Sequence, residues 1–219
     1  MTLPTLHPAL IQRLHTLCEH PRALLGIVGL PGAGKSTLAA LAASAAPDRA
    51  QAVPMDGFHL AQAELDRQGT ANRKGAPHTF DPAGYAALLR RLRQPNPDEV
   101  IYAPDFRRDL EEPIAGALAV PALTRLIISE GNYLLLDAGG WAPVAPLFDE
   151  VWYLQVDDAM RLQHLLERHM RFGRTREQAL AWIASNDEPN ARLIEATRSR
   201  AHHTVWWDSV AGHYAFEPR

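Results

Sequence analysis

Cysteine and long apolar segments are what this sequence most clearly lacks. Cys18 is the only cysteine among the 219 residues, so an internal disulfide framework is excluded. No uninterrupted apolar stretch approaches the ~20 residues that a membrane-spanning helix needs. The first residues, MTLPTLHPAL, do not show the pattern of a secretory signal. We therefore expect a cytoplasmic protein with no membrane partner.

Positive charge is also scarce, and lysine is scarcer still. The net charge of −3 provides no general basic field, so we expect no nucleic-acid partner. Of the 22 basic residues, only Lys35 and Lys74 are lysines. A compact ammonium group fits where the planar guanidinium group of arginine does not. Both lysines are therefore candidates for a specific site, although a chance surface position is an equal alternative for Lys74.

The clearest motif is GLPGAGKS at residues 29–36, which fits the phosphate-binding pattern G-x-x-x-x-G-K-[ST]. A buried strand is expected before it, at 23–30, and a helix after it, at 36–46. The loop amides and the positive end of that helix would hold phosphate oxygens. Lys35 would reach the β- and γ-phosphates, and the Ser36 hydroxyl would ligate Mg²⁺. The predicted nucleotide-binding residues of this segment are Gly29, Pro31, Gly32, Ala33, Gly34, Lys35, Ser36 and Thr37.

The rest of the chain alternates between expected strands and helices, which favours a parallel sheet. Because no linker separates two cores, we predict one domain over residues 1–219. Pro189 is expected to kink or break the helix that starts near 175. The further strands are expected at 51–56, 99–106, 124–132, 148–156 and 203–208, and the further helices at 4–20, 61–67, 81–92, 157–172 and 175–187.

Two acids follow buried strands and complement the phosphate loop. Glu130 follows the apolar residues LIIS and is the candidate partner of Mg²⁺, with a strand-end cap as the alternative. Asp56 ends the strand after the loop helix. Ligands of open parallel sheets bind at the carboxyl ends of strands, so Asp56 and Lys35 should open onto one crevice. A carboxylate there can take the proton of an attacking hydroxyl, although a turn-forming role before Gly57 is the alternative.

Three segments together resemble one family of kinases. MDGFHL (55–60), NRKGAPHTFD (72–81) and IISEGNYLLLD (127–137) are similar to segments of the phosphoribulokinase/uridine kinase/pantothenate kinase family. The resemblance covers roughly residues 23–170 and is closest to small bacterial nucleoside-kinase-like or fructokinase-like members. It implies a three-layer α/β P-loop fold, a mostly parallel sheet flanked by helices, and a short arginine-bearing lid at about 160–176. It also implies that Asp56 is the catalytic base, that ATP is the donor and that a homodimer forms.

The lid and the acceptor side are predicted with less support from motifs. Arg161, His164, Arg168 and Arg171 fall on one face of the expected helix, with His169 on the other. By match to the family's lid, Arg168 and Arg171 are the candidates for closing over ATP, while a solvated helix face is the alternative. The acceptor-side segment at 102–113 departs from both uridine and pantothenate kinases, which leaves the substrate open. The candidates for acceptor binding are Asp56, His59, Lys74, Tyr102, Arg107 and Asn132, with Tyr133 and Trp141 as alternatives for an aromatic wall.

Together these features predict a Mg²⁺- and ATP-dependent kinase that phosphorylates a hydroxyl group of a small polar metabolite. Lys35, Asp56 and Arg168 are the predicted catalytic residues, and Ser36 and Glu130 the predicted magnesium ligands. Two alternatives remain open. One is a true nucleoside kinase, and the other is a non-catalytic ATP-binding regulator built on the same fold.

Overall fold

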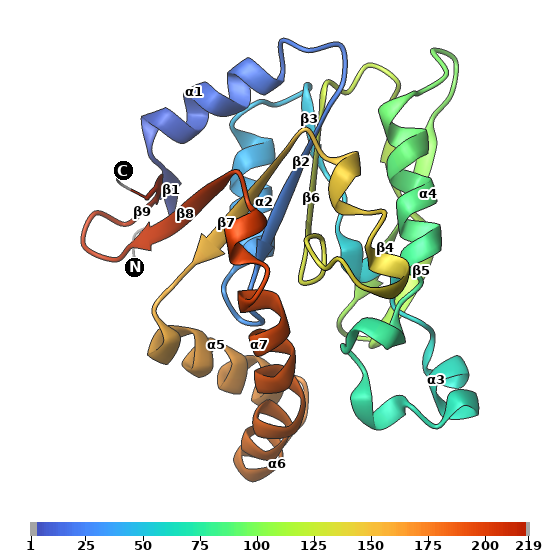
Figure 1. Cartoon of the computed structure of the whole chain (residues 1–219), viewed down its shortest axis with the longest axis vertical. Coiled ribbons are helices and arrows are strands. Elements are labelled where there is room, and N and C mark those ends of the chain that lie inside the picture. Colours follow the sequence, from blue (N-terminus) through green and yellow to red (C-terminus); the bar gives the residue numbers. More distant parts are fainter. Residues whose placement is uncertain (1–3, 218–219) are drawn as a thin grey trace.

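A seven-stranded, mostly parallel sheet forms the centre of the protein in the computed structural model, which describes residues 4–217 (Figure 1). Its strand order is β1-β9-β8-β7-β2-β6-β3. β8, β7, β2, β6 and β3 all run parallel to one another. β9 is antiparallel to β8 and parallel to β1. The strands are β1 (Thr5–Leu6), β2 (Ala23–Gly29), β3 (Ala50–Ala52), β6 (Leu126–Gly131), β7 (Glu150–Gln155), β8 (His203–Asp208) and β9 (His213–Phe216).

The three central strands are apolar along nearly their whole length because helices cover both faces of the sheet. Every residue of β2 and β6 is buried, and only the last residue of β7 is exposed. Continuous apolar runs are typical of parallel strands buried on both faces. The strands expected at 23–30, 124–132 and 148–156 are confirmed.

The helices divide between the two faces. One core cluster joins the sheet to α1 (Pro8–Leu17) and α2 (Lys35–Ser44), and a second joins it to α4 (Pro82–Arg93). The remaining helices are α3 (Gln62–Gln68), α5 (Asp158–Arg171), α6 (Arg176–Trp182) and α7 (Glu188–Glu195). This gives the expected three layers of helix, sheet and helix. No helix of residues 4–217 has the length and apolar character needed to cross a membrane.

Two expected strands differ from the structure. The strand expected at 51–56 ends at Ala52, and Asp56 instead lies in a 3₁₀ helix, Met55–Phe58. The strand expected at 99–106 is β4 (Ile101–Arg107), but it lies outside the main sheet. It pairs only with β5 (Glu112–Val120), antiparallel, in a hairpin that the sequence analysis missed.

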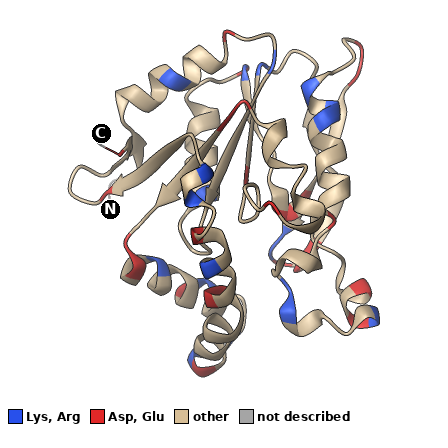
Figure 2. Ribbon diagram, in the orientation of Figure 1, with Lys and Arg blue, Asp and Glu red and all other residues tan. Residues whose placement is uncertain are grey.

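The lid predicted at about 160–176 corresponds to most of α5 and the start of α6. With the π-helical turn and α7, which are included in the lid from here on, it extends beyond the sheet near the end of β2 (Figure 1). Figure 2 shows charged residues of both signs along α5, α6 and α7. A π-helical turn, Ile183–Asp187, joins α6 to α7, and Pro189 stands in the first turn of α7. A proline is tolerated there because the amides of a first turn have no partner within the helix. The break expected at Pro189 therefore takes the form of a π-helical turn just before it.

Candidate active site

The phosphate-binding loop joins β2 to α2, as its motif predicts. Lys35 is the first residue of α2 and is buried, and its Nζ donates hydrogen bonds to the Gly29 and Leu30 carbonyl oxygens at 3.0 and 3.1 Å. Burial is the main cause that lowers the pKa of Lys35 to about 8, and the Glu130 and Asp56 carboxylates only partly oppose it. The lysine is thus held at the loop, although burial disfavours its charged form. Bound phosphates would favour that charged form.

The loop packs directly against the lid through Gly32. A Cβ at this position would lie 2.7 Å from Leu165 Cγ and 2.8 Å from the Arg161 carbonyl oxygen, both on α5. Gly32 also has a φ of +84°, a left-handed conformation that glycine adopts without strain. The lid helix therefore contacts the segment that would surround the phosphates.

Ser36 and Glu130 face each other across the loop. The Ser36 hydroxyl donates to Glu130 Oε1 at 2.7 Å, and Glu130 is buried one residue before the end of β6. Burial, together with the neighbouring Asp56 carboxylate, raises the pKa of Glu130. Mg²⁺ prefers hard oxygen ligands, and kinases commonly hold it with one or two protein groups plus substrate phosphates. The hydroxyl and the carboxylate fit such a site.

Asp56 is positioned by close contact between its 3₁₀ helix and the β4–β5 hairpin. A Cβ at Gly57 would lie 2.5 Å from the Pro104 carbonyl oxygen, so only glycine allows this approach. Arg108, at the end of β4, donates from a guanidinium nitrogen to Asp56 Oδ2 at 3.3 Å. Burial alone would raise the pKa of Asp56, but His59, Arg108 and Lys35 together hold it below its ordinary value. The carboxylate is therefore ionised near neutral pH and available as a base.

One cavity of about 900 Å³ brings most of the predicted residues together. It is lined by Pro31, Gly32, Gly34, Lys35, Ser36, Thr37, Asp56, His59, Lys74, Glu130, Asn132, Arg168 and Arg171. Gly29 and Ala33 belong to the loop but do not line this cavity. Gly29 ends β2 and accepts a hydrogen bond from Lys35, and Ala33 is buried in the core beneath the loop.

Two predicted acceptor residues lie outside the cavity. The side chain of Tyr102 on β4 is turned to solvent, with 61% of the residue exposed. Arg107 is also exposed, and its guanidinium pairs with Asp109 at 2.8 Å. Of the two adjacent hairpin arginines, it is Arg108 that lines the cavity, and the sequence analysis missed it.

Phe106 is an aromatic residue of the cavity that was also missed, and it is the candidate for the aromatic wall of the acceptor side. Its ring lies 4.7 Å from the His59 ring, between centroids, and both residues line the cavity. The two suggested alternatives, Tyr133 and Trp141, are buried in the core. Their polar groups donate to the Gly75 and Pro77 carbonyl oxygens, so they support the loop at 71–79 from behind.

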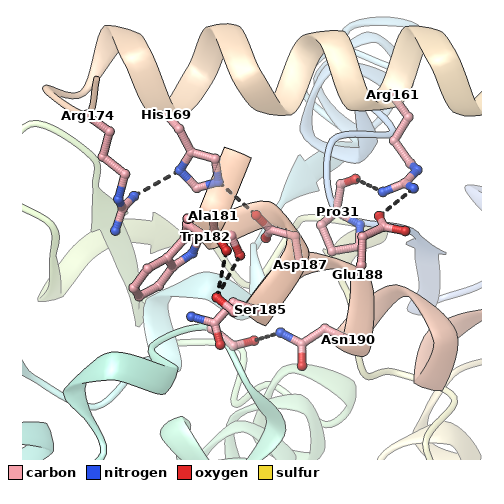
Figure 3. A network of polar contacts seen from close by, with 12 residues as sticks. Pro31, Arg161, His169, Arg174, Ala181, Trp182, Ser185, Asp187, Glu188 and Asn190 are labelled. Carbon is pink, nitrogen blue, oxygen red and sulfur yellow. Dashed lines mark hydrogen bonds and ion pairs between the residues drawn. The ribbon is translucent and has the colours of Figure 1, made fainter. Parts of the chain in front are cut away.

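A polar network inside the lid is shown in Figure 3. His169 is buried, accepts from Arg174 at Nδ1 and contacts Asp187 Oδ2 from Nε2 at 2.8 Å. Because arginine only donates, the imidazole carries its proton on Nε2 and donates it to Asp187. The Arg174 guanidinium also lies 4.1 Å from the Trp182 ring. The network ties α5 to the π-helical turn and so fixes the orientation of the lid helices.

Arg161 does not belong with the lid arginines that face the cavity. Its side chain is buried and pairs with Asp158 and Glu188, both at 2.7 Å, on the side of α5 that packs near Pro31 (Figure 3). Arg168 and Arg171 line the cavity as expected. Burial, followed by the nearby positive charge of Arg108, lowers the pKa of Arg168.

The lid also contacts the loop that carries Lys74. Arg73 donates to the Ser185 carbonyl oxygen at 2.6 Å, and Asn186 donates to the Asn72 carbonyl oxygen at 2.9 Å. Asn190 of α7 donates to the Gly75 carbonyl oxygen at 3.3 Å. These bonds join the acceptor side of the cavity to the lid.

A phosphate-binding loop, a carboxylate beside its serine, a second carboxylate across the cavity and an arginine-bearing lid together define a P-loop kinase. No protein-family model matches the chain. It is 34% identical over 198 residues to "Putative uridine kinase C227.14" of Schizosaccharomyces pombe, covering 85% of this chain and 84% of that protein. It is 33% identical over 218 residues to "Uncharacterized protein YggC" of Escherichia coli, covering 97% and 88% of the two chains.

A solved structure is similar over nearly the same length. The crystal structure described as a "putative fructose transport system kinase" from Silicibacter sp. TM1040 has a TM-score of 0.79 and 38% identity, and the match covers 91% of this chain and 98% of that one. The chain therefore belongs to the phosphoribulokinase/uridine kinase/pantothenate kinase family of P-loop kinases.

Proposed function

We propose that this protein is an ATP- and Mg²⁺-dependent kinase that phosphorylates a hydroxyl group of a small polar metabolite. The observation that carries the proposal is the shared cavity of Lys35 and Asp56. A phosphate-binding lysine and an ionised carboxylate open onto one space, so a triphosphate and a hydroxyl acceptor have room to meet there. The names of two relatives, which refer to uridine and fructose, agree with a small hydroxylated acceptor.

The residues divide the reaction between them. The acceptor oxygen forms a bond to the γ-phosphorus, the bond from that phosphorus to the bridging β,γ-oxygen breaks, and ADP leaves. The hydroxyl proton passes to Asp56. Lys35 and the loop amides hold the phosphates, and Arg168 and Arg171 neutralise charge on the transferred group and exclude water. Ser36 and Glu130 would hold Mg²⁺, which shields the negative charge of the β- and γ-phosphates.

The test is ADP release with Mg-ATP across a panel of acceptors: fructose, uridine, cytidine, nicotinamide riboside, pantothenate and ribulose 5-phosphate. Asp56→Asn should keep ATP affinity and lower kcat by about 10²–10⁴, the usual contribution of a general base. Asp109→Asn is the matched control, because Asp109 pairs with Arg107 outside the cavity. An unchanged kcat in Asp56→Asn would refute the assigned base.

The acceptor panel also tests the alternative function, a non-catalytic ATP-binding regulator. A regulator without catalysis would bind ATP and show no acceptor-dependent ADP release, so the panel separates the two functions. The homodimer, and the lack of nucleic-acid and membrane partners, stay predictions that sizing and binding assays test.

A further inference from the structure

Lys74 and Arg108 are cations of the cavity that the nucleotide does not account for; a third, Arg174, is held by His169 and the Trp182 ring. Lys35, Arg168 and Arg171 are assigned to the phosphates of the nucleotide, whereas Lys74 and Arg108 come from the acceptor loop and the β4–β5 hairpin. Both lie near His59. Burial is the main cause that lowers the pKa of His59, and the charges of Lys74 and Arg108 add to it. The acceptor side therefore concentrates positive charge around one small region.

Lys74 lacks a counter-charge. Its Nζ donates to Gln62 Oε1 at 3.3 Å and to the Glu111 carbonyl oxygen at 2.5 Å, which are both uncharged groups. Within residues 4–217, no carboxylate lies within 4 Å of this ammonium; the Glu111 carboxylate lines the cavity but pairs with neither Lys74 nor Arg108. An ammonium group with only neutral partners in a cavity gains much more from an anionic ligand than from a neutral one.

Arg108 has a carboxylate partner, but that partner is the proposed base. Its contact with Asp56 occupies one of the two carboxylate oxygens. An acceptor with its own anionic group offers the guanidinium a competing partner and leaves Asp56 free to receive the hydroxyl proton. A neutral acceptor leaves the ion pair in place. The arrangement therefore favours acceptors that carry negative charge.

A polar atom near these cations also lacks a partner. Asn190 is 3% exposed and lines the cavity, and its Oδ1 has no hydrogen-bond partner within the described residues. A buried carbonyl oxygen without a donor is costly and is commonly satisfied by a ligand or water.

We propose that the acceptor is a small hydroxylated anion, whose carboxylate or phosphate group binds Lys74 and Arg108 while one of its hydroxyls reaches Asp56. This inference rests on the proposed kinase function and narrows its substrate class. Lys74 and Arg108 are then the residues that determine specificity, and fructose or a nucleoside lacking a charged group is a poor acceptor.

The experiment measures binding to protein saturated with Mg²⁺ and the non-hydrolysable analogue AMP-PNP, so that the phosphate loop is filled. Calorimetry and thermal shift compare matched pairs: pantothenate with pantothenol, glycerate with glycerol, ribose 5-phosphate with ribose, and fructose 6-phosphate with fructose. The first two pairs test a carboxylate and the last two a phosphate. The variants are Lys74→Gln and Arg108→Gln. Arg107→Gln is the control, because it removes the adjacent arginine outside the cavity.

The expected result is that the anionic member of at least one pair binds at least tenfold more tightly than its neutral counterpart. Lys74→Gln and Arg108→Gln should each reduce that preference by about 10- to 100-fold, the contribution of a charge-assisted contact, while Arg107→Gln keeps it. Equal binding within every pair overturns the inference, as does a preference that survives both variants or no binding by any anion. Failure of the kinase function itself appears separately, as the absence of acceptor-dependent ADP release with every member of the acceptor panel.

Discussion

The buried lysine of the phosphate loop makes nucleotide affinity depend on pH in a defined direction. The pKa of Lys35 is about 8, chiefly because burial disfavours its charge. Bound phosphates favour the charged form and raise this pKa. Binding therefore takes up a proton, so affinity is fully present below pH 8 and is lost as the pH rises above it.

The size of the effect follows from the pKa. Well above pH 8, Lys35 must gain a proton when the nucleotide binds, so the dissociation constant of the nucleotide rises about tenfold for each pH unit. Between pH 7.5 and 9.5 this amounts to about 25-fold for a single group with that pKa. Lys35→Met removes the titrating group but keeps a long side chain. Its affinity should be weaker at pH 7.5 and nearly constant across the same range.

Calorimetry with Mg-AMP-PNP in buffers of different ionisation enthalpy measures both quantities. At pH 9, wild type should take up about one proton per molecule bound, and Lys35→Met close to none. The reasoning is refuted if wild-type affinity is flat from pH 7.5 to 9.5, if a proton is released, or if the variant shows the same slope.

Two further pairs of substitutions test how the loop and the hairpin are built. Gly32→Ala should lower the melting temperature by about 3–10 °C, because its Cβ meets Leu165 and the Arg161 carbonyl oxygen on α5. Gly69→Ala is the control, since it has a similar positive φ but nothing within 4 Å, and an equal effect in both would mean that strain alone matters. Tyr102→Ala should change the acceptor KM by less than about threefold, because a solvent-facing side chain contributes little. Phe106→Ala should raise that KM several-fold more, and the reverse order would contradict the assigned wall.

Two site residues that the sequence predicted, Lys35 and Glu130, lie within or shortly after central strands. Lys35 follows a glycine-rich loop of fixed length, and Glu130 belongs to a strand whose apolar residues mark it as buried. In such segments, the amino-acid pattern indicates the position in the fold, because a parallel strand that helices cover on both faces reads as a nearly continuous apolar run. Asp56 was also identified, although it lies in a 3₁₀ helix and not at the end of a strand.

The hairpin residues of the acceptor side could not be predicted in the same way because they depend on the register of β4 and β5. Tyr102 and Arg107 are five residues apart, so they would lie on opposite faces of a regular strand. The pairing of β4 with β5 shifts between Ala103 and Asp105, and this irregularity leaves both side chains exposed. Pro104 stands at the shift and Gly116, with a φ of +67°, lies in the facing part of β5, so both mark an irregularity, but neither tells which side chains it turns to solvent. Arg108 could be chosen over Arg107 only once the fold brought it beside Asp56.

The separation of β4 and β5 from the main sheet has a consequence for how this family diversifies. The groups proposed to bind phosphate lie on or beside β2, β6 and α5, whereas Phe106 and Arg108 belong to a two-stranded unit with its own pairing. Mutations at hairpin positions that face the cavity or solvent can therefore accumulate without altering the strand order, whereas Ile101, Ala103 and Val120 are buried in a core cluster shared with the main sheet. Selection for a new metabolite would act first on this unit, and grafting it between relatives is a direct route to exchanging their specificity.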